Sequence, residues 1–538
     1  MMPMTIARTF NLADLFDIAA EAVPDREAVV VGATRLSFRQ LADRVSRLAG
    51  WLHARGIGDS DTVGLHLYNG IEYLEAFLAA CKVKAVPVNI NYRYVADELR
   101  YLYQNAGLKA LFYSAALAAG VREALDAAPG LQAIVRVGDD AISIPGETDY
   151  RAALATPPGG ADHIARSDDD ISVLYTGGTT GRPKGVMWPH KAYFFSALGG
   201  GGAMNPELGP IHAPEQLGER ARSSFPLRGM PVAPLMHGSA LWAALIGLFA
   251  GHTVFLSERH HFDAEHILDL LAREKIHTVS IVGDAMAAPI LDALRACPGR
   301  WDLSNLMAFA NGGALFSAHV KKGLLEILPR LVIVDGAGSS EAGTFSPSSQ
   351  PTTAGLLRLP PSPHLKVLVD GRRLAASGEQ GILARTGLVP IGYLGDPEKT
   401  SETFITFEGQ RWVLTGDIAL QEGDGSIVVF GRGSNCINTG GEKVFVEEVE
   451  EAVRRHPAVF DCLVVGLPDA RWGNKVVAVV ALRPGATADA AALRAHCRDH
   501  LAGYKVPKDV VFVDAMQRSP AGKGDYRWAR KVAERALA

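Results

Sequence analysis

The feature that most constrains this chain is a short apolar run followed at once by a segment rich in glycine and threonine. The run at 171–175 is mostly apolar or β-branched, which is typical of a buried strand. Gly177 and Gly178 end it, because glycine permits positive φ angles and lets successive N–H groups point into one concavity. Thr179 and Thr180 add hydroxyl donors to the same turn. A strand with this turn predicts a loop that holds phosphate oxygens.

Lys184 adds a positive charge to this segment, so its composition fits a triphosphate. The obvious alternative is the Walker loop, G-x-x-x-x-G-K-[ST]. The segment does not match it, because Pro183 occupies the glycine position before the lysine and Gly185 stands where Ser or Thr would bind Mg²⁺. The loop therefore indicates a different class of nucleotide-using protein.

Bulk properties favour a soluble protein of several structural units that acts on small molecules. The chain has 538 residues, which is too long for one compact core. Its content of 48% hydrophobic and 21% charged residues is ordinary for a globular protein. The net charge of −4 provides no electrostatic attraction to nucleic acid or to an anionic membrane.

The cysteines and the apolar runs predict a cytoplasmic location. The 5 cysteines contain no C-x-x-C pair, which argues against a disulfide framework and against a zinc site. The longest apolar run, 241–251, is far shorter than the roughly 20 residues that a membrane helix needs. Asp14 and Asp17 interrupt the first apolar stretch, so a secretory signal is not expected.

Helical and strand-like patterns alternate along the chain. The segment 36–56 has the period of an amphipathic helix, with Ser37 and Gln40 at capping-box spacing and Gly56 at the expected C-cap. Short apolar runs that end in glycine, Asp-Gly or Asn-Gly lie at 277–282, 306–310 and 331–334. This alternation predicts an α/β fold with mainly parallel sheets, flanked by helices and with ligand loops at the strand ends.

A boundary is expected near Gly431, where the sequence becomes rich in Gly, Ser and Asn. After it, patterns typical of a charged helix (446–456) and of two strands (462–466 and 476–482) follow. We therefore predict a large N-terminal domain at 1–431 and a small α+β domain at 432–538.

The glycine-rich segment resembles a known signature. The order Y-T-x-G-T-T-G-x-P-K-G-V is similar to the phosphate loop of the adenylate-forming superfamily, which includes acyl-CoA synthetases, luciferases and the adenylation domains of peptide synthetases. Gly177 stands where this family usually has serine, so the loop has one hydroxyl donor fewer. The resemblance implies a large N-terminal domain and a small mobile C-terminal lid.

Further motifs of the family follow in its order. The segment 335–343, DGAGSSEAG, is similar to the family's Y-G-x-[ST]-E motif, with Ser340 in the hydroxyl position and Glu341 in the acidic position. A carboxylate beside a triphosphate is repelled unless Mg²⁺ lies between them, so Glu341 is expected to contact the metal. Ala337 replaces the aromatic residue that usually lies against adenine.

Three more segments resemble the nucleotide-binding positions of the family. Asn311 begins an N-G-G-A loop similar to the one that lines the adenine and acyl pocket. Asp417 ends a T-G-D motif whose aspartate accepts hydrogen bonds from the ribose hydroxyls in the family. Arg432 matches the arginine that follows and helps to hold the nucleotide.

Lys523 and His237 are the expected catalytic residues. Lys523 ends a segment similar to the family's P-x-x-G-K motif. Attack of a carboxylate on an α-phosphate builds negative charge among anions, which a positioned cation can compensate. His237 matches a position that borders the acyl carboxylate in the family.

The lid and its hinge show one match and one departure. Gly440, Gly441, Glu442 and Lys443 resemble the lid loop that contacts the nucleotide or the pantetheine arm. The family's hinge, G-R-x-K-D, is changed here, because Ser434 and Asn435 replace the Lys-Asp pair. Asparagine tolerates large φ/ψ changes, so rotation of the lid is expected to persist.

The resemblance thus implies a set of binding residues. The expected metal contacts are Thr180 and Glu341. The residues expected to bind the nucleotide or coenzyme A are Thr176, Gly177, Gly178, Thr179, Thr180, Gly181, Lys184, Gly312, Gly313, Ala314, Asp335, Gly338, Ser339, Ser340, Asp417, Arg432, Gly440, Gly441 and Glu442.

The resemblance covers nearly the whole chain and implies an acyl-CoA synthetase that uses ATP, Mg²⁺ and coenzyme A. A carboxylate and ATP would form an acyl-adenylate and pyrophosphate, and a thiol would then attack. No carrier domain and no polar set for an amino acid is evident, so a fatty or bulky apolar acid is favoured, including one with a ring system. The glycines at 199–202 and the small residues Ala285, Ala287 and Ala288 suggest room for it.

Three alternatives remain open at this point. An acyl-AMP ligase that loads a carrier protein would share every motif. A luciferase-like monooxygenase is a related option. A nucleotide-binding regulator without turnover would be consistent with the changes at Ala337, Ser434 and Asn435, although Lys523 is retained. The sequence does not determine the oligomeric state, and a homodimer is one option.

Overall fold

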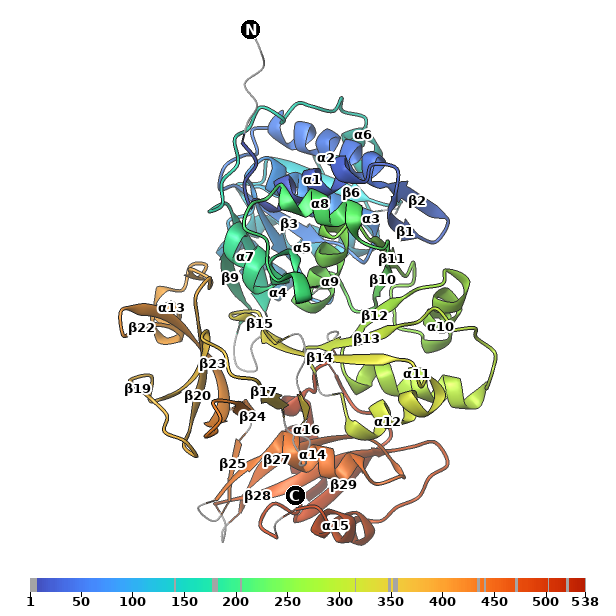
Figure 1. Ribbon diagram of the computed structural model, residues 1–538, viewed down its shortest axis with the longest axis vertical. Coiled ribbons are helices and arrows are strands. Elements are labelled where there is room, and N and C mark those ends of the chain that lie inside the picture. Colours follow the sequence, from blue (N-terminus) through green and yellow to red (C-terminus); the bar gives the residue numbers. More distant parts are fainter. Residues whose placement is uncertain are drawn as a thin grey trace.

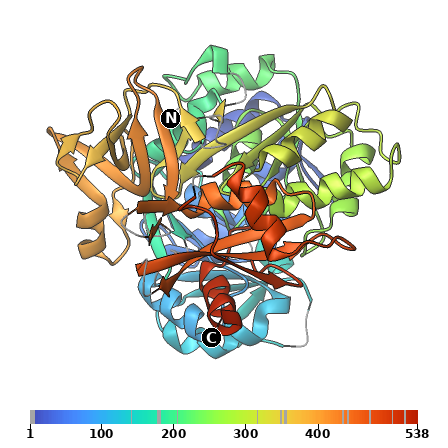
Figure 2. The same cartoon turned by 90° about the horizontal axis from the view of Figure 1, so that it is seen from below.

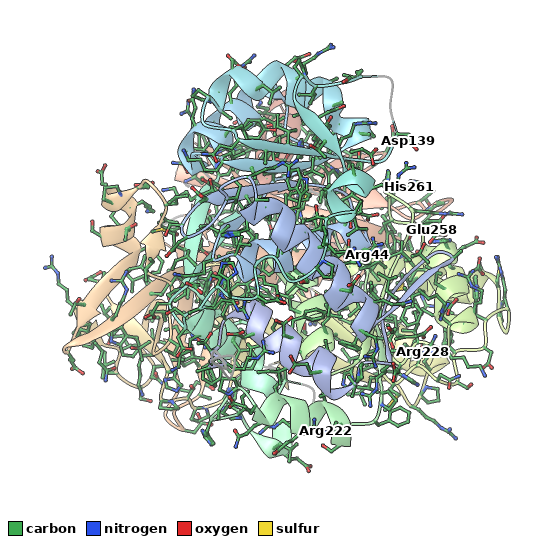
Figure 3. All side chains as sticks on the ribbon, turned by 90° about the horizontal axis from the view of Figure 1, so that it is seen from above. Arg44, Asp139, Arg222, Arg228, Glu258 and His261 are labelled. Atoms are coloured by element: carbon green, nitrogen blue, oxygen red, sulfur yellow. The ribbon has the colours of Figure 1, made fainter. Side chains whose placement is uncertain are left out.

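The computed structural model describes most of the chain. The described residues are 7–139, 142–176, 182–203, 206–314, 316–346, 350–351, 357–432, 436–439, 442–469, 473–501, 503–518 and 522–537. Three large sheets form the N-terminal part, and a smaller C-terminal unit lies below them in Figure 1. Charged side chains such as Arg222, Arg228 and Glu258 lie around the outside of the molecule (Figure 3).

The first sheet carries the strand of the glycine-rich segment. Its order is β21-β9-β8-β4-β3-β5-β6-β7, and it is parallel from β8 to β7. The strands are β3 (Thr62–His66), β4 (Val86–Asn89), β5 (Ala110–Ser114), β6 (Ala133–Val137), β7 (Glu147–Asp149), β8 (Ile171–Thr176), β9 (Lys184–Pro189) and β21 (Gly392–Tyr393).

The second sheet contains the other apolar runs. Its order is β15-β14-β13-β12-β10-β11-β1-β2, and it is parallel from β14 to β1. The strands are β1 (Glu27–Val31), β2 (Thr34–Ser37), β10 (Arg228–Pro231), β11 (Thr253–Leu256), β12 (Thr278–Ile281), β13 (Ala308–Gly312), β14 (Val332–Ser339) and β15 (Gly343–Ser346). The runs at 277–282, 306–310 and 331–334 therefore form neighbouring parallel strands, as predicted.

Helices cover these sheets (Figure 1). They are α1 (Leu12–Ala22), α2 (Phe38–His53), α3 (Ile71–Lys82), α4 (Ala96–Ala106), α5 (Ala118–Ala124), α6 (Tyr150–Leu154), α7 (His190–Ser196), α8 (Gln216–Ser223), α9 (Gly238–Phe249), α10 (Ala264–Arg273), α11 (Asp284–Ala296) and α12 (Ala318–Ile327). Single 3₁₀ turns lie at Ala115–Leu117, Leu125–Ala127, Gly199–Gly201 and Pro206–Leu208. Among the helices that the structure describes, none combines the length and apolarity that crossing a bilayer requires.

Helix α2 illustrates how local sequence sets an element. The Ser37 hydroxyl accepts from the Gln40 N–H at 3.2 Å, and the Gln40 side chain accepts from the Ser37 N–H at 2.8 Å. This is the capping box that the spacing predicts. The apolar face of the helix is buried, and the helix ends at His53, before Gly56.

A third sheet is antiparallel, which the sequence patterns did not indicate. Its main order is β16-β17-β24-β23-β20-β18-β19, with β22 paired to β23. The strands are β16 (Gln350–Pro351), β17 (Leu357–Leu359), β18 (Leu365–Val369), β19 (Arg373–Leu374), β20 (Gln380–Thr386), β22 (Phe404–Phe407), β23 (Gln410–Gln421) and β24 (Ile427–Arg432), and α13 spans Pro397–Thr403. It lies beside the two parallel sheets in Figure 1.

The C-terminal unit begins after β24 and has a hydrophobic core of its own. It contains β25 (Cys436–Thr439), β26 (Glu442–Phe445), α14 (Val446–Arg454), β27 (Val459–Asp469), β28 (Gly473–Leu482), α15 (Ala490–Arg498), β29 (Asp509–Val513) and α16 (Tyr526–Leu537). Strands β27, β28 and β29 form one sheet, and β25 and β26 form a hairpin. This is an α+β arrangement, and the predicted boundary at 431/432 falls at the end of β24.

The C-terminal unit docks on the N-terminal part (Figure 2). Arg483 forms an ion pair with Asp292 of α11 at 3.0 Å. The Ala318 N–H, at the start of α12, donates to the Glu451 carboxylate of α14 at 3.4 Å. A carboxylate is favoured at a helix N-terminus, so the Glu451 contact stabilises the docked arrangement. The Arg483–Asp292 ion pair adds a second polar contact between the two parts.

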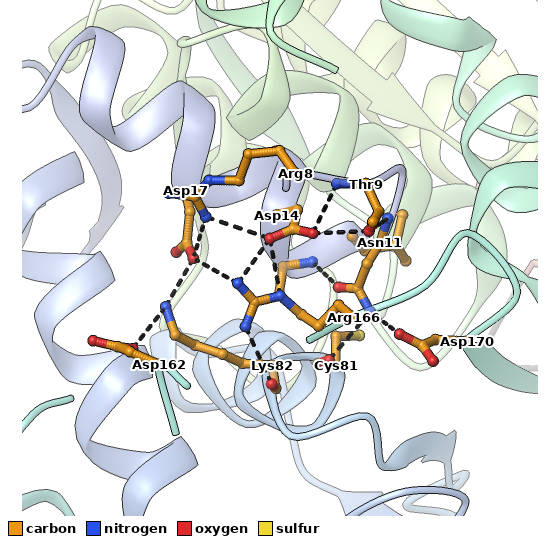
Figure 4. A network of polar contacts seen from close by, with 12 residues as sticks. Arg8, Thr9, Asn11, Asp14, Asp17, Cys81, Lys82, Asp162, Arg166 and Asp170 are labelled. Carbon is orange, nitrogen blue, oxygen red and sulfur yellow. Dashed lines mark hydrogen bonds and ion pairs between the residues drawn. The ribbon is translucent and has the colours of Figure 1, made fainter. Parts of the chain in front are cut away.

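A buried ionic network joins the N-terminal helices to the strand that precedes the phosphate loop (Figure 4). Arg166 contacts Asp14 at 2.7 Å, and their side chains are only 6% and 2% exposed. Asp14 also accepts from the Thr9 hydroxyl at 2.8 Å, and Lys82 contacts Asp17 at 2.8 Å. Burial alone would raise the pKa of Asp14, but Arg166 and Thr9 outweigh it and lower that pKa.

Asp14→Ala is expected to lower the free energy of unfolding by about 3–5 kcal/mol, because it leaves the Arg166 guanidinium buried without its main partner. Urea denaturation measures this change. Asp43→Ala is the matched control, since Asp43 pairs with Arg47 on the surface of α2 and such pairs contribute about 1 kcal/mol or less. Equal losses in the two variants would show that the buried pair has no special role.

Candidate active site at the strand ends

In the sequence, the glycine-rich segment connects two strands that pair with each other. Strands β8 and β9 pair antiparallel, with Thr176 opposite Lys184. The predicted ligands between them, Gly177, Gly178, Thr179, Thr180 and Gly181, lie outside the described residues. The end of β8 and the start of β9 lie side by side, because Thr176 and Lys184 are paired.

Lys184 already lies among polar and aromatic partners. Its ammonium is 3.1 Å from the carboxylate of Asp396 and 5.4 Å from the centre of the Tyr393 ring. A hydrogen bond from the Lys399 N–H, together with Lys184, lowers the pKa of Asp396, so this carboxylate is ionised at neutral pH. The ion pair holds the lysine side chain beside the hairpin.

The acidic motif lies in the turn between β14 and β15, next to the hairpin. The Tyr393 hydroxyl donates to Glu341 at 3.2 Å. The Trp188 indole N–H, on β9, donates to the Ser340 carbonyl at 2.9 Å. Within the turn, the Ala342 N–H donates to the Ser339 hydroxyl at 3.1 Å. The β8–β9 hairpin and the Glu341 turn are therefore joined by one direct hydrogen bond, and Tyr393 of β21 adds a second bond to the turn.

Gly338 is required by close packing, because an added Cβ would clash with the Gly343 carbonyl on β15. Its neighbour Ala337, which replaces the family's aromatic residue, packs against an apolar cluster of the antiparallel sheet.

Asn311 organises the N-G-G-A loop. Its side-chain oxygen accepts from the Gly283 N–H at 2.7 Å, and its amide donates to the Asp335 carboxylate at 2.7 Å and to the Ala314 carbonyl at 3.0 Å. Lys321 forms an ion pair with the same carboxylate. Asp335 is thus anchored on two sides rather than free for a ligand.

Gly312 and Gly313 of the N-G-G-A loop have more space around them than Gly338 on β14. A Cβ added at Gly312 would meet no atom within 4 Å, and one at Gly313 would be 3.9 Å from Val282. Neither position is crowded by the residues that the structure describes.

The ribose motif lies on β23. Gly416 adopts a φ of 77°, and the Asp417 N–H donates to the Thr415 hydroxyl at 3.1 Å. Asp417 is the register partner of Arg432 on β24. The two predicted nucleotide residues are therefore adjacent, although the Arg432 side chain is outside the described atoms.

Of the predicted lid loop, Gly440 and Gly441 lie outside the described residues, and the backbone of Glu442 begins β26. The hinge residues Ser434 and Asn435 also lie outside them.

His237 caps the N-terminus of α9 and has one buried nitrogen available. Its Nε2 atom has no hydrogen-bond partner among the described residues. Burial lowers the pKa of His237 to about 4, and the charges of Lys523 and Arg93 act in the same direction. The imidazole is therefore neutral at pH 7. Asn89 bonds the adjoining backbone, donating to the Met236 carbonyl at 2.6 Å and to the Tyr175 carbonyl at 2.9 Å.

Lys523 belongs to the C-terminal unit, yet its charge acts on His237 of the N-terminal part. Its neighbour Gly522 has a φ of +71°, and a Cβ there would lie 3.0 Å from the Val282 carbonyl and 3.3 Å from Ala285. The structure thus brings the two predicted catalytic residues to the same region.

The small residues that the sequence suggested for an acyl pocket are packed instead. Ala287 and Ala288 are buried in the main core. A Cβ on Gly200 would lie 2.7 Å from Phe195, and one on Gly202 would lie 2.5 Å from the Gly209 carbonyl. At these positions the expectation of open space was wrong, because they are closely packed, whereas Ala285 is half-buried.

Comparison with known proteins identifies the family. Residues 16–387 match the family model described as AMP-binding enzyme, and residues 448–523 match the AMP-binding enzyme C-terminal domain. This chain belongs to the AMP-binding enzyme family. The match confirms the resemblance to adenylate-forming enzymes and the α/β fold with a small C-terminal domain.

Relatives of this AMP-binding enzyme extend over nearly its whole length. It is 41% identical to the medium-chain acyl-CoA ligase Mig of Mycobacterium avium, over 97% of this chain and 98% of that one. It is also 41% identical to a 3-oxocholest-4-en-26-oate–CoA ligase of Rhodococcus rhodochrous, over 97% of this chain and 95% of that one. The ATP-bound structure of MatB from Rhodopseudomonas palustris superimposes with a TM-score of 0.80 at 25% identity, covering 97% and 100% of the two chains.

Sequence reasoning missed several residues of the site. Tyr393 and Asp396 come from a segment far along the chain that reaches Lys184 only because β21 pairs with β9. Asn89 lies in an apolar strand, where a single buried amide was the only available signal. Asn311 was noted as the start of a glycine loop, but its bonds to Gly283 and Asp335 depend on strand pairing.

His237→Gln is expected to reduce the loss of stability at low pH without abolishing it, because buried His66, His190 and His252 also have lowered pKa values. Below pH 6.5 the unfolded imidazole takes up a proton that the folded one, with its pKa of about 4, does not, so the free energy of unfolding falls as pH falls. Glutamine removes this loss, which amounts to about 1–2 kcal/mol between pH 7 and pH 5. Urea denaturation at each pH measures it.

His212→Gln, on an exposed turn, is the control and should leave the slope unchanged. A wild-type slope in His237→Gln would contradict the neutral, buried state of this imidazole.

Proposed function

We propose that this AMP-binding enzyme is an AMP-forming acyl-CoA ligase, which converts a carboxylic acid, ATP and coenzyme A into an acyl-CoA, AMP and pyrophosphate. The observation that carries the proposal is 41% identity over nearly the full length of ligases with this activity in their names. The approach of Lys523 to the strand ends supports it, because adenylation requires a cation there.

The proposed substrate is an apolar carboxylic acid, either a medium- or long-chain fatty acid or a steroid-type acid with a fused ring system. Both kinds are named among relatives of equal identity. No short polar set for an amino acid was evident in the sequence, which agrees with an apolar acid.

We assign the nucleotide to the surface between the β8–β9 hairpin, the β14–β15 turn and β23. Lys184 and the hairpin backbone would bind phosphates, with Lys184 exchanging Asp396 for a phosphate oxygen. Asp417 would accept from the ribose hydroxyls, and Gly312 and Gly313 would border the adenine. Thr176, Ala314, Ser339 and Ser340 complete this surface, while Asp335 acts by holding Asn311.

The residues present fit Mg²⁺. The described part of the chain contains no group of three or more His, Cys, Asp or Glu side chains that could enclose a metal. Mg²⁺ is commonly held by one or two carboxylates together with substrate phosphates, and Glu341 offers one carboxylate beside the hairpin. Glu341 and Thr180 would hold the ion, which supplies charge neutralisation to the phosphates when bound. Tyr393 orients the Glu341 carboxylate.

The chemistry follows in two steps. The substrate carboxylate oxygen attacks the α-phosphorus of ATP, and the bond to the pyrophosphate oxygen breaks. Lys523 compensates the charge that builds on the α-phosphate, and neutral His237 offers its unpartnered Nε2 to the substrate beside it. In the second step the thiol of coenzyme A loses its proton, its sulfur attacks the acyl carbonyl carbon, and AMP leaves.

The proposed division is a 1–431 domain that binds the substrates and a 432–538 domain that carries Lys523. We also propose a cytoplasmic location, with coenzyme A rather than a carrier protein as the acceptor.

A panel of carboxylates is expected to release pyrophosphate with fatty or steroid-type acids and to yield a thioester when coenzyme A is present. Pyrophosphate release and thioester absorbance are the measurements. Short polar acids and amino acids serve as controls. Adenylation that never proceeds to a thioester with free coenzyme A would favour loading of a carrier protein instead, and light emission with oxygen would favour a luciferase-like activity.

Lys523→Ala is expected to slow adenylation by about 10²- to 10³-fold, because the transition state loses its positioned cation. Capture of pre-formed acyl-adenylate by coenzyme A should persist. Pyrophosphate exchange and thioester formation measure the two half-reactions on the same preparation. Equal loss of both half-reactions would contradict the role assigned to Lys523.

A further inference from the structure

The segment that carries Lys523 is closed at its base. Arg518 and Gly524 form an antiparallel bridge, and the Asp525 N–H donates to the Gln517 carbonyl at 3.2 Å. The loop thus leaves and rejoins the C-terminal unit at one place. Lys523 lies directly before Gly524, so the backbone position of the lysine depends on how this short loop is held.

The Arg518 side chain spans the loop. Its Nη1 atom donates to the Gly522 carbonyl at 2.8 Å. Its Nε and Nη2 atoms donate to the two oxygens of Asp461 at 2.7 and 2.6 Å. Because Gly522 immediately precedes Lys523, the guanidinium connects the peptide unit next to the lysine to a fixed carboxylate on β27. A planar fork of this kind fixes direction as well as distance.

Asp461 is itself held rigidly. It is 8% exposed and accepts from the Cys462 N–H at 2.8 Å and from Arg454 at 3.4 Å. Arg454 in turn contacts Glu450 at 3.1 Å. Burial alone would raise the pKa of Asp461, but Arg518 and Arg454 lower it, so the carboxylate remains charged. The anchor of Arg518 is thus a buried ionic network with two cations and two carboxylates.

The glycines on either side of Lys523 are closely packed against their neighbours. A Cβ on Gly524 would clash with Leu463 of β27. A Cβ on Gly522 would press on the Val282 carbonyl and on Ala285 of the N-terminal part. Gly522 and Gly524, which flank Lys523, are therefore both closely packed, and a small displacement at Gly522 moves the lysine relative to His237.

We propose that Arg518 is a positioning residue for Lys523, acting through its bond to the Gly522 carbonyl and anchored by Asp461. This rests on the proposed function, in which Lys523 serves adenylation. Arg518 does not touch the substrates in this role. It keeps the loop in the one conformation that presents the lysine when the C-terminal unit is docked.

The test is R518K, which keeps the positive charge beside Asp461 but cannot make the fork and reach Gly522 together. We expect adenylation, measured by pyrophosphate exchange, to fall about 10- to 100-fold in kcat, as small misplacements of catalytic groups do. The KM for ATP should change little. Thioester formation from pre-formed acyl-adenylate should stay within about twofold of wild type and reports the folded fraction of the same preparation.

R530K is the matched control, because Arg530 makes an exposed pair with Glu534 on α16 of the same unit. It should match the wild type in both half-reactions. D461N is the second variant, which keeps the shape of the anchor and removes its charge. We expect the same selective loss of adenylation from it.

The double variant R518K/K523A separates this proposal from the proposed function. If Arg518 acts only through Lys523, R518K will lower the residual adenylation rate of K523A by no more than about twofold. A full additional loss in that background, an equal loss of both half-reactions, or wild-type adenylation in R518K would each overturn the positioning role. If K523A itself retains adenylation, the assignment of Lys523 fails instead.

Discussion

The site depends on one constraint, which is that neighbouring parallel strands end at the same edge of a sheet. Asn311 fixes the relative positions of the segments at this edge. It bonds Gly283 after β12, Ala314 after β13 and Asp335 on β14, so the segments at three neighbouring strands keep one arrangement. Each hydrogen bond of the Asn311 side chain contributes modestly to the free energy of folding. A buried partner left without its hydrogen bond would lower that stability more. The surface proposed for the nucleotide follows from this edge.

A second level of organisation is the docking of the C-terminal unit. Arg483 with Asp292 is a partly exposed ion pair, whereas Glu451, which accepts from the N–H at the start of α12, is buried. Inside the C-terminal unit, Arg454 and Arg518 both donate hydrogen bonds to Asp461. The C-terminal unit thus contacts the N-terminal part through polar groups, and a buried ionic network holds Arg518 beside the segment that carries Lys523.

Much of the fold could be predicted from the sequence, because local patterns carry it. The capping box at Ser37 and the apolar runs on β12, β13 and β14 have their expected structures. The antiparallel sheet was missed, although several of its paired strands, such as β22 with β23 and β23 with β24, follow one another closely in the sequence. The prediction of an open pocket at Ala287 and Ala288 was wrong, because a small side chain indicates close packing as readily as empty space.

The sequence by itself determined the family and the residues expected to carry its chemistry: a glycine- and threonine-rich segment, Glu341, Asp417 and Lys523, in the order of the AMP-binding enzymes. Those residue types suffice because charge and hydrogen-bonding capacity belong to each side chain. Only the tertiary structure decided which groups support them, such as Tyr393 between Lys184 and Glu341, or Arg518 behind Lys523. These partners are brought together by strand pairing and docking over long sequence separations, and no local pattern encodes such distances.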